Sequence, residues 1–295
     1  MRQPAYGGMV MSNIRNSGTI LVFLGAVFWS LNAPLVKFLT ADPLLICGLR
    51  SIIAGITLMP FIRWKRLNWT PWMVVYISSY CALCISIILA LAKTSAAIAI
   101  GMQYTATIWL FLANLIITRK FNKKAFWPVC VIFAGVIFFM CSGTDNSSSS
   151  GNMIALLEGI FFAFMSVGAK KSAGTNPLGL TAIANLVTGV FVFTAFPSTA
   201  GYMGTLSAGD WTVLLILGII QIGAGYGFYN LGIQKISAQK ASVIALWEMI
   251  LGPVWVALFL KEYPTPLVLT GFIIILAGML LDSKINVPQA RQAAL

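Results

Sequence analysis

The sequence contains no histidine and only seven acidic residues among 295. Imidazole and clustered carboxylates supply the bases and metal ligands of most membrane enzymes. The seven acids here are scattered, without the spacing of a metal site. We therefore expect no metal and no cofactor, and a membrane-embedded enzyme of lipid metabolism is the weaker alternative for this chain.

Charge of either sign is scarce. Charged residues make up 9% of the chain and hydrophobic residues 59%, with a mean hydropathy of +0.91. A soluble domain carries about 25% charged residues because water must wet its surface. The 19 Lys and Arg lie in short clusters between apolar runs, not along a basic stripe. This arrangement indicates membrane lipids as partners and no nucleic acid.

Disulfide bonds are not expected. The five cysteines all fall inside apolar stretches, and Cys81-x-x-Cys84 has neither a second Cys pair nor any His to form a metal site. We interpret them as small buried side chains.

Ten apolar runs are long enough to cross a bilayer, for which about 20 residues are needed per helix. They predict an all-α integral membrane protein. The runs cover 18–38, 43–62, 72–92, 95–117, 125–142, 152–170, 177–197, 211–233, 239–260 and 265–282.

The positions of the cations predict the orientation. With a cytoplasmic N-terminus, 15 of the 19 Lys and Arg fall on the cytoplasmic side, and only Lys37, Arg50, Lys93 and Lys261 fall outside. We therefore expect both tails, 1–17 and 283–295, to be cytoplasmic in a bacterial inner membrane.

The chain also repeats itself. Two series of residues recur in the same order, first 134 and then 142 positions later, on either side of a polar linker at 143–151. Two repeats, 18–142 and 152–282, are therefore predicted, and five spans each require them to be inverted. The matching residues are Gly25, Lys37, Pro43 and Gly55 with Gly159, Lys171, Pro177 and Gly189, and Lys93, Ser95, Ala96 and Ala99 with Lys235, Ser237, Ala238 and Ala241.

Three motifs carry a resemblance to a known family. They are Gly25-Ala-Val-Phe-Trp-Ser-Leu-Asn32 followed by Lys37 and Pro43, Gly225-Tyr-Gly-Phe-Tyr-Asn-Leu-Gly-Ile233, and Glu248 with Glu262 fourteen positions later. In this order they resemble the EamA-type branch of the drug/metabolite transporter superfamily.

The resemblance implies ten helices in two inverted repeats, with the fifth and tenth at the periphery. The sequence departs from the family pattern at Met249, where Pro is usual, and at Lys261, where Gly is usual. The tyrosines of the third and eighth helices are similar to those of aromatic amino acid exporters.

Glu248 is the strongest candidate site residue. It lies about 13 Å into its helix from the cytoplasmic end, near the midplane. A charge there is costly, so an ionisable residue indicates a function such as contact with a substrate ammonium group or proton coupling. The alternative is a structural carboxylate bonded to a neighbouring helix.

Arg50 and Glu158 form a second candidate. Both lie about 9–10 Å from the outer ends of their helices, so they could form an ion pair. Such a pair could be an external gate or a structural lock, or Arg50 could extend outward to the headgroups.

Polar and aromatic side chains at similar depth predict a substrate pocket, although each could instead bond helices together. These candidates are Tyr80, Gln103, Tyr104, Asn185, Gln221 and Trp247, with Trp29 and Asn32 nearer the outer face.

The function predicted from these features is secondary transport of small organic metabolites by alternating access. Amino acids or amphipathic aromatic compounds are the expected substrates, and export the expected direction. Coupling to protons, and a monomer or a homodimer, stay open alternatives, as do a channel and a non-transporting scaffold.

Overall fold

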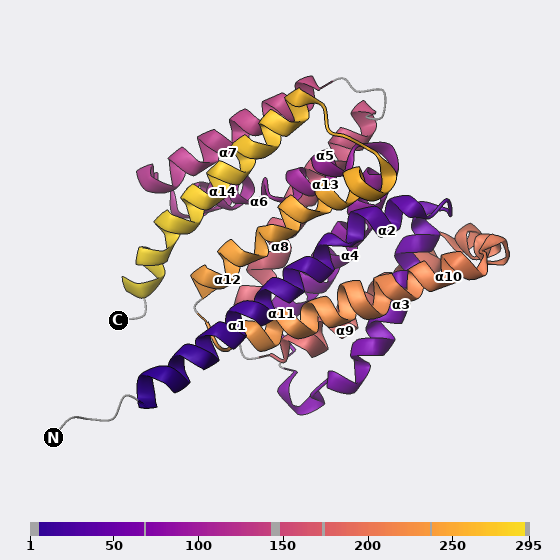
Figure 1. Ribbon diagram of the computed structural model, residues 1–295, viewed down its shortest axis with the longest axis horizontal. Helices are drawn as coiled ribbons and strands as arrows, with labels where there is room; N and C mark the ends of the chain where they lie inside the picture. Colours follow the sequence, from indigo (N-terminus) through magenta and orange to yellow (C-terminus); the bar gives the residue numbers. More distant parts are fainter. Residues whose placement is uncertain (1–5, 68, 143–147, 173–174, 237, 293–295) are drawn as a thin grey trace.

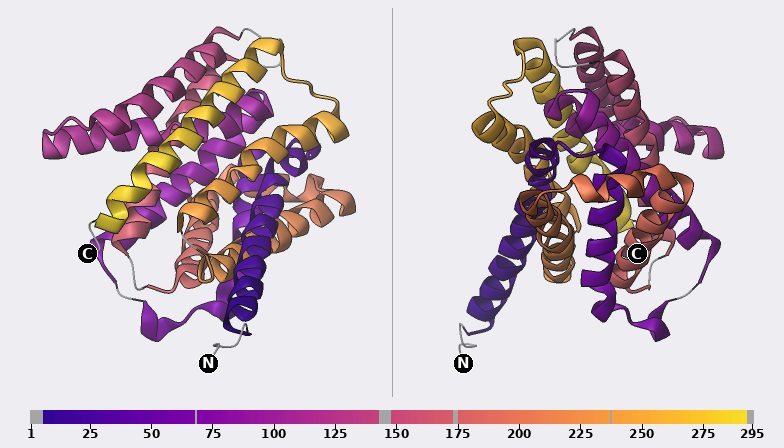
Figure 2. Two further views of the ribbon diagram at one scale, coloured as in Figure 1. Left: turned by 60° about the vertical axis from the view of Figure 1, so that its left-hand side comes forward. Right: turned by 90° about the vertical axis from the view of Figure 1, so that its right-hand side faces the viewer.

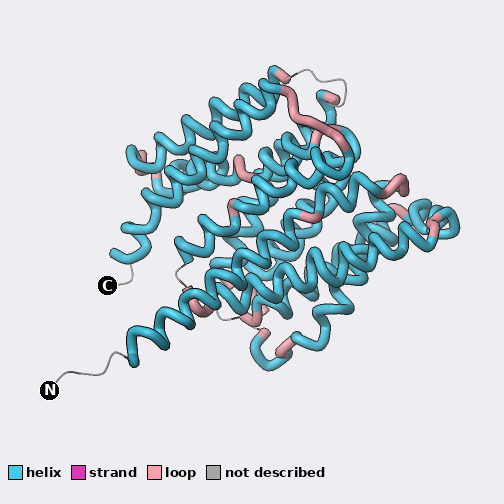
Figure 3. Tube along the Cα trace, viewed as in Figure 1, coloured by secondary structure: helices cyan, strands magenta, loops and turns pink. Residues whose placement is uncertain are grey.

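The computed structural model describes residues 6–67, 69–142, 148–172, 175–236 and 238–292. Within these ranges the chain is helical with short connections and contains no strand (Figure 3). Ten helical segments in the described residues are long and apolar enough to span a membrane, and their ends fall within four residues of the predicted runs. The expected all-α membrane fold is confirmed.

Several spans consist of more than one helix. The first half contains α1 (Tyr6–Ser30), α2 (Asn32–Phe38), α3 (Pro43–Leu58), η1 (Met59–Phe61), η2 (Trp64–Arg66), α4 (Pro71–Lys93), α5 (Ala96–Gln103), α6 (Ala106–Thr118) and α7 (Lys123–Cys141). The second half contains α8 (Ser149–Lys171), α9 (Pro177–Ala195), η3 (Pro197–Thr205), α10 (Ala208–Leu215), η4 (Ile216–Ala224), α11 (Gly225–Ile233), α12 (Ala238–Ala245), α13 (Trp247–Leu260) and α14 (Pro266–Gln292).

Helix continues into the regions predicted as tails and linker. α1 begins at Tyr6 and α14 ends at Gln292, because an apolar run marks the membrane segment and not the end of the helix. α8 begins at Ser149, where the Ser148 side chain accepts a hydrogen bond from the Gly151 N–H. The other linker residues, 143–147, lie outside the described residues, as do 1–5 and 293–295 of the tails.

The backbone repeats at matching positions of the two halves. α3 and α9 both begin with a proline, Pro43 and Pro177, whose missing N–H is not needed in the first turn. α6 and α13 both end at a residue in the left-handed conformation, Arg119 with φ 51° and Lys261 with φ 55°. These two are the only non-glycine residues with positive φ in the described chain, and they lie 142 positions apart.

The helix packing has the same symmetry. The four largest contacts join α4 with α8, α7 with α14, α3 with α9, and α1 with α11 (Figure 1). Exchanging each span for its equivalent in the other half turns the α1–α11 pair into the α8–α4 pair and leaves the other two pairs unchanged. This is the pattern expected of two inverted five-span repeats. α7 and α14 lie side by side at one edge of the bundle.

Both termini lie at one end of the bundle (Figures 1 and 2). We call this end, where α1 begins and α14 ends, the terminal side. The opposite end, where α2, α4 and α7 end and α3, α5 and α8 begin, is the distal side.

We number the ten membrane-spanning segments in chain order as spans 1 to 10. Span 1 (Ser17–Phe38), span 4 (Ala96–Thr118) and span 9 (Val243–Leu260) are each interrupted within their length. Span 1 breaks at Leu31, three residues before Pro34, which has no N–H for the Ser30 carbonyl. Span 4 breaks at Tyr104 and Thr105, where the Thr105 hydroxyl donates to the Met102 carbonyl at 2.7 Å. Span 9 breaks at Leu246, 142 positions after Tyr104. Span 8 is not broken but widens into a π-helix over Ile216–Ala224, a feature frequent at functional sites.

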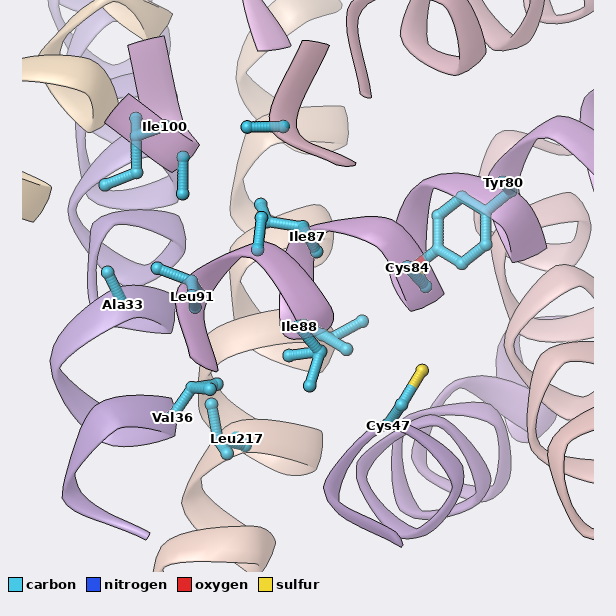
Figure 4. Packing of buried hydrophobic residues seen from close by; sticks show 14 of the residues in the cluster. Ala33, Val36, Cys47, Tyr80, Cys84, Ile87, Ile88, Leu91, Ile100 and Leu217 are labelled. Carbon is cyan, nitrogen blue, oxygen red and sulfur yellow. The ribbon is translucent and has the colours of Figure 1, made fainter. Parts of the chain in front are cut away.

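Apolar side chains fill the distal half of the interior. Figure 4 shows part of this core, with side chains from α2, α3, α4, α5 and η4 gathered together. Val36, Ile88 and Leu91 are at most 4% exposed. The same cluster continues toward the terminal side, where Leu58 and Met73 are also buried.

Candidate functional site

A cavity of about 460 Å³ lies between the two halves, within the size range of small-molecule sites. Its walls come from eight of the ten spans, with none from α7 or α9. Of the predicted pocket residues, six line it: Trp29, Tyr80, Gln103, Tyr104, Gln221 and Glu248. Their part in substrate binding stays a prediction.

The cavity is closed at the distal side. Its wall residues lie in the middle and terminal-side parts of the spans, from Ile87 at the distal limit to Ala169, Ala245 and Met279 near the terminal ends. The apolar core described above separates it from the distal surface.

A polar network joins the helix ends on the distal side. The Lys37 ammonium lies 2.8 Å from Glu262 Oε2 and donates to the Thr94 carbonyl at 3.0 Å. Glu262 Oε1 accepts the Ala96 N–H at 3.0 Å, so the same carboxylate caps the N-terminus of α5. The Thr94 hydroxyl bonds to Asn152 of α8 at 2.6 Å. Spans 1, 3, 4 and 6 and the loop before span 10 are thereby tied together.

Glu248 occupies the first turn of α13, directly after the break in span 9. Its side chain is partly buried at the cavity wall, and Oε2 accepts a hydrogen bond from the Tyr104 hydroxyl at 3.4 Å. Tyr104 lies at the equivalent break of span 4, so the two interrupted helices bring an acid and a phenol together. No described Lys or Arg lies within ion-pair distance of Glu248.

Arg50 also lines the cavity and is 3% exposed. The predicted ion pair with Glu158 does not form in this structure. Arg50 Nη1 donates instead to Asn32 Oδ1 at 2.5 Å, and neither oxygen of the fully buried Glu158 has a hydrogen-bond partner among the described residues. Equal depth does not bring two side chains together, because their helices direct them to different neighbours.

Asn32 and Asn185 form hydrogen bonds to side chains that line the cavity, but do not line it themselves. Asn32 accepts the hydrogen bond from Arg50. Asn185 is fully buried in α9 and donates to the Tyr80 hydroxyl at 2.8 Å. Both were predicted to contact substrate, but they do not line the cavity and instead hold side chains that do.

Trp247 lies outside the cavity, contrary to the prediction. It is 44% exposed, and its ring packs edge-on against Phe23 of α1 with centroids 5.8 Å apart. Adjacent helical residues point about 100° apart, so Trp247 faces the bilayer where Glu248 faces inward.

The cavity wall is more aromatic than predicted. Trp29 contacts the rings of Tyr226 and Tyr229 at centroid distances of 4.9 and 4.7 Å, and Tyr76 stacks on Tyr80 at 6.0 Å. Tyr76, Tyr226 and Tyr229 were not among the predicted site residues. The spacing could have identified Tyr76, which lies one turn before Tyr80, whereas Tyr226 lies five residues after Gln221 and reaches the cavity only beyond the π-helix of span 8.

Such a site can hold one small organic molecule. The rings offer flat apolar faces, Arg50 offers a cation, Glu248 offers an acid, and Gln103 and Gln221 offer amide groups.

Comparison with known proteins identifies the class. The EamA-like transporter family matches residues 16–141 and again residues 149–283. The chain therefore belongs to the EamA-like transporter family and is a multi-pass membrane protein.

The relatives are distant. A Bacillus subtilis transporter named YxxF is 27% identical over 197 residues, which cover 64% of this chain and 62% of that protein. A second Bacillus subtilis transporter, YwfM, is 20% identical over 91% of this chain and 94% of its own length. A biotin transporter of Salmonella typhimurium is 27% identical over 56% of each chain.

One solved crystal structure superposes with a TM-score of 0.61 over 90% of this chain and 96% of its own. The two sequences are 16% identical, so the comparison shows a shared fold.

Proposed function

We propose that this protein is a secondary transporter that carries small organic solutes across the membrane by alternating access. The observation that carries the proposal is the cavity between the two repeats, which is lined by aromatic rings with one cation and one acid and separated from the distal surface by packed apolar side chains. Inverted repeats provide two arrangements of similar energy around a central site, which alternating access requires.

In this proposal the structure corresponds to a state open to the terminal side. The Lys37–Glu262 network and the apolar core form the closed distal gate. With the predicted cytoplasmic termini, the cavity would load from the cytoplasm, which supports export as the direction.

Glu248 is proposed to take up the cation of the transport cycle, either a proton or an ammonium group of the solute. A carboxylate in this position must be protonated, paired or wet, because an unpaired anion is too costly in hydrocarbon. The Tyr104 hydroxyl stabilises it but brings no charge.

A channel is the less suitable alternative, because packed apolar side chains, among them Val36, Ile88 and Leu91, lie between the cavity and the distal surface. A scaffold without transport would not need a cavity of about 460 Å³ that contains two unpaired charged groups.

The proposal is tested by counterflow in proteoliposomes containing the purified full chain. The solutes would be amino acids, nucleotides, cationic drugs and biotin, which is included because one relative is named a biotin transporter. We expect saturable counterflow of at least one organic solute. Protein-free liposomes are the control, and the absence of counterflow for every class would refute the proposal.

A further inference from the structure

Arg50 is a buried cation without an anion. Its side chain is 3% exposed, its Nη1 donates to the neutral amide oxygen of Asn32, and its other close partner is the thiol of Cys84. Nε–H has no partner among the described residues. No described carboxylate lies within ion-pair distance, although Glu158 and Glu248 are both inside the bundle.

Such an arrangement is unfavourable in an empty site. Guanidinium is a cation, and its burial without an anion costs free energy. A buried charge is stable when it is paired. Glu248 accepts from Tyr104, and Glu158, which has no hydrogen-bond partner among the described residues, does not reach Arg50 in this structure. The missing anion therefore has to come from the contents of the cavity.

We infer that Arg50 binds a carboxylate group of the transported solute, so that the substrates are small organic acids with an aromatic or otherwise planar body. This inference rests on the proposed function, since it names the class of solute that the same cavity selects. Arg is suited to this role because its planar N–H groups match the two oxygens of a carboxylate. Asn32 fixes the guanidinium from behind.

The rest of the cavity fits such a solute. Arg50 lies seven residues from the distal end of its span, about 10 Å deep, while Glu248 lies twelve residues from the distal end of its own, about 18 Å deep. The carboxylate would thus lie at the closed end. The body would extend toward the open side between Trp29, Tyr80 and Tyr226, whose ring faces favour a flat apolar group.

A purely structural Arg50 would tie α3 to Asn32 of α2 and leave the cavity without preference for charge. The two roles differ in ligand selectivity. A structural residue affects all ligands alike through stability, whereas an anion site discriminates between an acid and its uncharged amide.

The experiment measures ligand-induced shifts in the melting temperature of the purified full chain in detergent. The first set is 3-phenylpropionate, 3-phenylpropionamide, phenethylamine and phenylalanine, which share one ring and differ in their charged groups. Biotin and its amide, and indole-3-acetate and its amide, form two further pairs. We expect at least one acid to bind at least tenfold more tightly than its amide.

Three variants locate the effect. Arg50→Gln should reduce the acid-to-amide ratio to about one and leave amide binding in place, and Arg50→Lys should restore part of the ratio. Arg63→Gln removes an exposed cation from the terminal side and is the matched control, with the ratio unchanged. Should Arg50→Gln fail to fold, the ratios of wild type and Arg50→Lys still decide the question.

Equal binding of acid and amide in the wild type, no response to any acid, or an unchanged ratio in Arg50→Gln would each overturn the inference. The proposed function fails separately, when no solute of any charge shows counterflow.

Discussion

Glu248 and Arg50 are charged side chains that line the same cavity, and the sequence predicted the position of Glu248 correctly but the partner of Arg50 incorrectly. Glu248 was identified from its depth alone, and the structure places it at the cavity wall beside Tyr104. Arg50 was identified as an intramembrane charge but paired with the wrong partner. Depth along a helix follows from the sequence at 1.5 Å per residue, whereas direction depends on neighbours that the sequence does not reveal.

The first prediction concerns Glu248→Gln. The amide oxygen can still accept the Tyr104 hydrogen bond, so the free energy of unfolding should change by no more than about 1 kcal/mol. The charge is lost, and we expect counterflow to fall at least tenfold. Thermal melting and counterflow rates of the purified variant check both statements.

Glu158→Gln is the matched control, because Glu158 is an intramembrane acid that does not line the cavity. Its counterflow should equal that of wild type. Full activity of Glu248→Gln, or a large loss of stability with unaltered specific activity, would make Glu248 a structural group.

The other incorrect site predictions have the same cause: the sequence gives the depth of a side chain along its helix but not the direction in which it points. Trp247 and Glu248 are adjacent and equally deep, yet one faces the outside and the other the cavity. Asn185 and Asn32 were correctly placed as interior polar groups, but their hydrogen bonds turn them toward Tyr80 and Arg50.

At the scale of helices, apolar length predicted all ten spans, because bilayer thickness constrains it directly. The interruptions were not predicted. The break in span 1 follows from Pro34, and the bond from the Thr105 hydroxyl to the Met102 carbonyl accompanies the break in span 4. The breaks at Tyr104 and Leu246 depend on how the two halves pack around the cavity, and no helix-breaking residue occupies either position.

Glycine residues allow the close helix contacts, and Gly168→Ala tests one of them. A Cβ there would lie 2.8 Å from the backbone nitrogen of Tyr76 and 2.9 Å from its Cα. Because this backbone belongs to α4 and cannot rotate away, α8 and α4 must separate. We expect a destabilisation of about 1–3 kcal/mol, seen as a lower melting temperature.

Gly227→Ala is the control, since nothing lies within 4 Å of its added Cβ. It should melt at or above the wild-type temperature, because alanine favours helix over glycine. Equal melting temperatures for the two variants would contradict the close α4–α8 contact.

At the scale of the whole molecule, the repeat was visible in the sequence because a few glycines, prolines and lysines recur at constant offsets. The structure adds equivalences that no residue identity shows, such as Arg119 with Lys261 at the helix ends. The cavity itself could be predicted only as a place between the halves, since its shape arises from side chains of eight spans.

The final prediction concerns orientation. Single cysteines at Lys123 and Ser150, in a variant lacking the five native cysteines, should differ in labelling by a membrane-impermeant maleimide. Position 150 should react in intact cells and position 123 only after lysis, because the Lys and Arg residues gather on the side of the termini. Labelling of position 123 from outside would reverse the topology and, with it, the proposed direction of export.

A carrier with two identical halves would have no preference between its two open states. Here the positions equivalent to Lys37 and Glu262 are Lys171 and Lys120, two cations that cannot attract each other, and Lys171 instead lies 5.8 Å from the centre of the Trp72 ring. In the proposed cycle the distal gate therefore has an ionic latch, and the described residues at the equivalent terminal-side positions form no matching ion pair. If the latch contributes about 1 kcal/mol, the unloaded carrier rests roughly five times more often with its distal gate shut. A charge difference at one repeated position, Glu262 against Lys120, thus favours the state with the distal gate shut as the resting state of the proposed transport cycle.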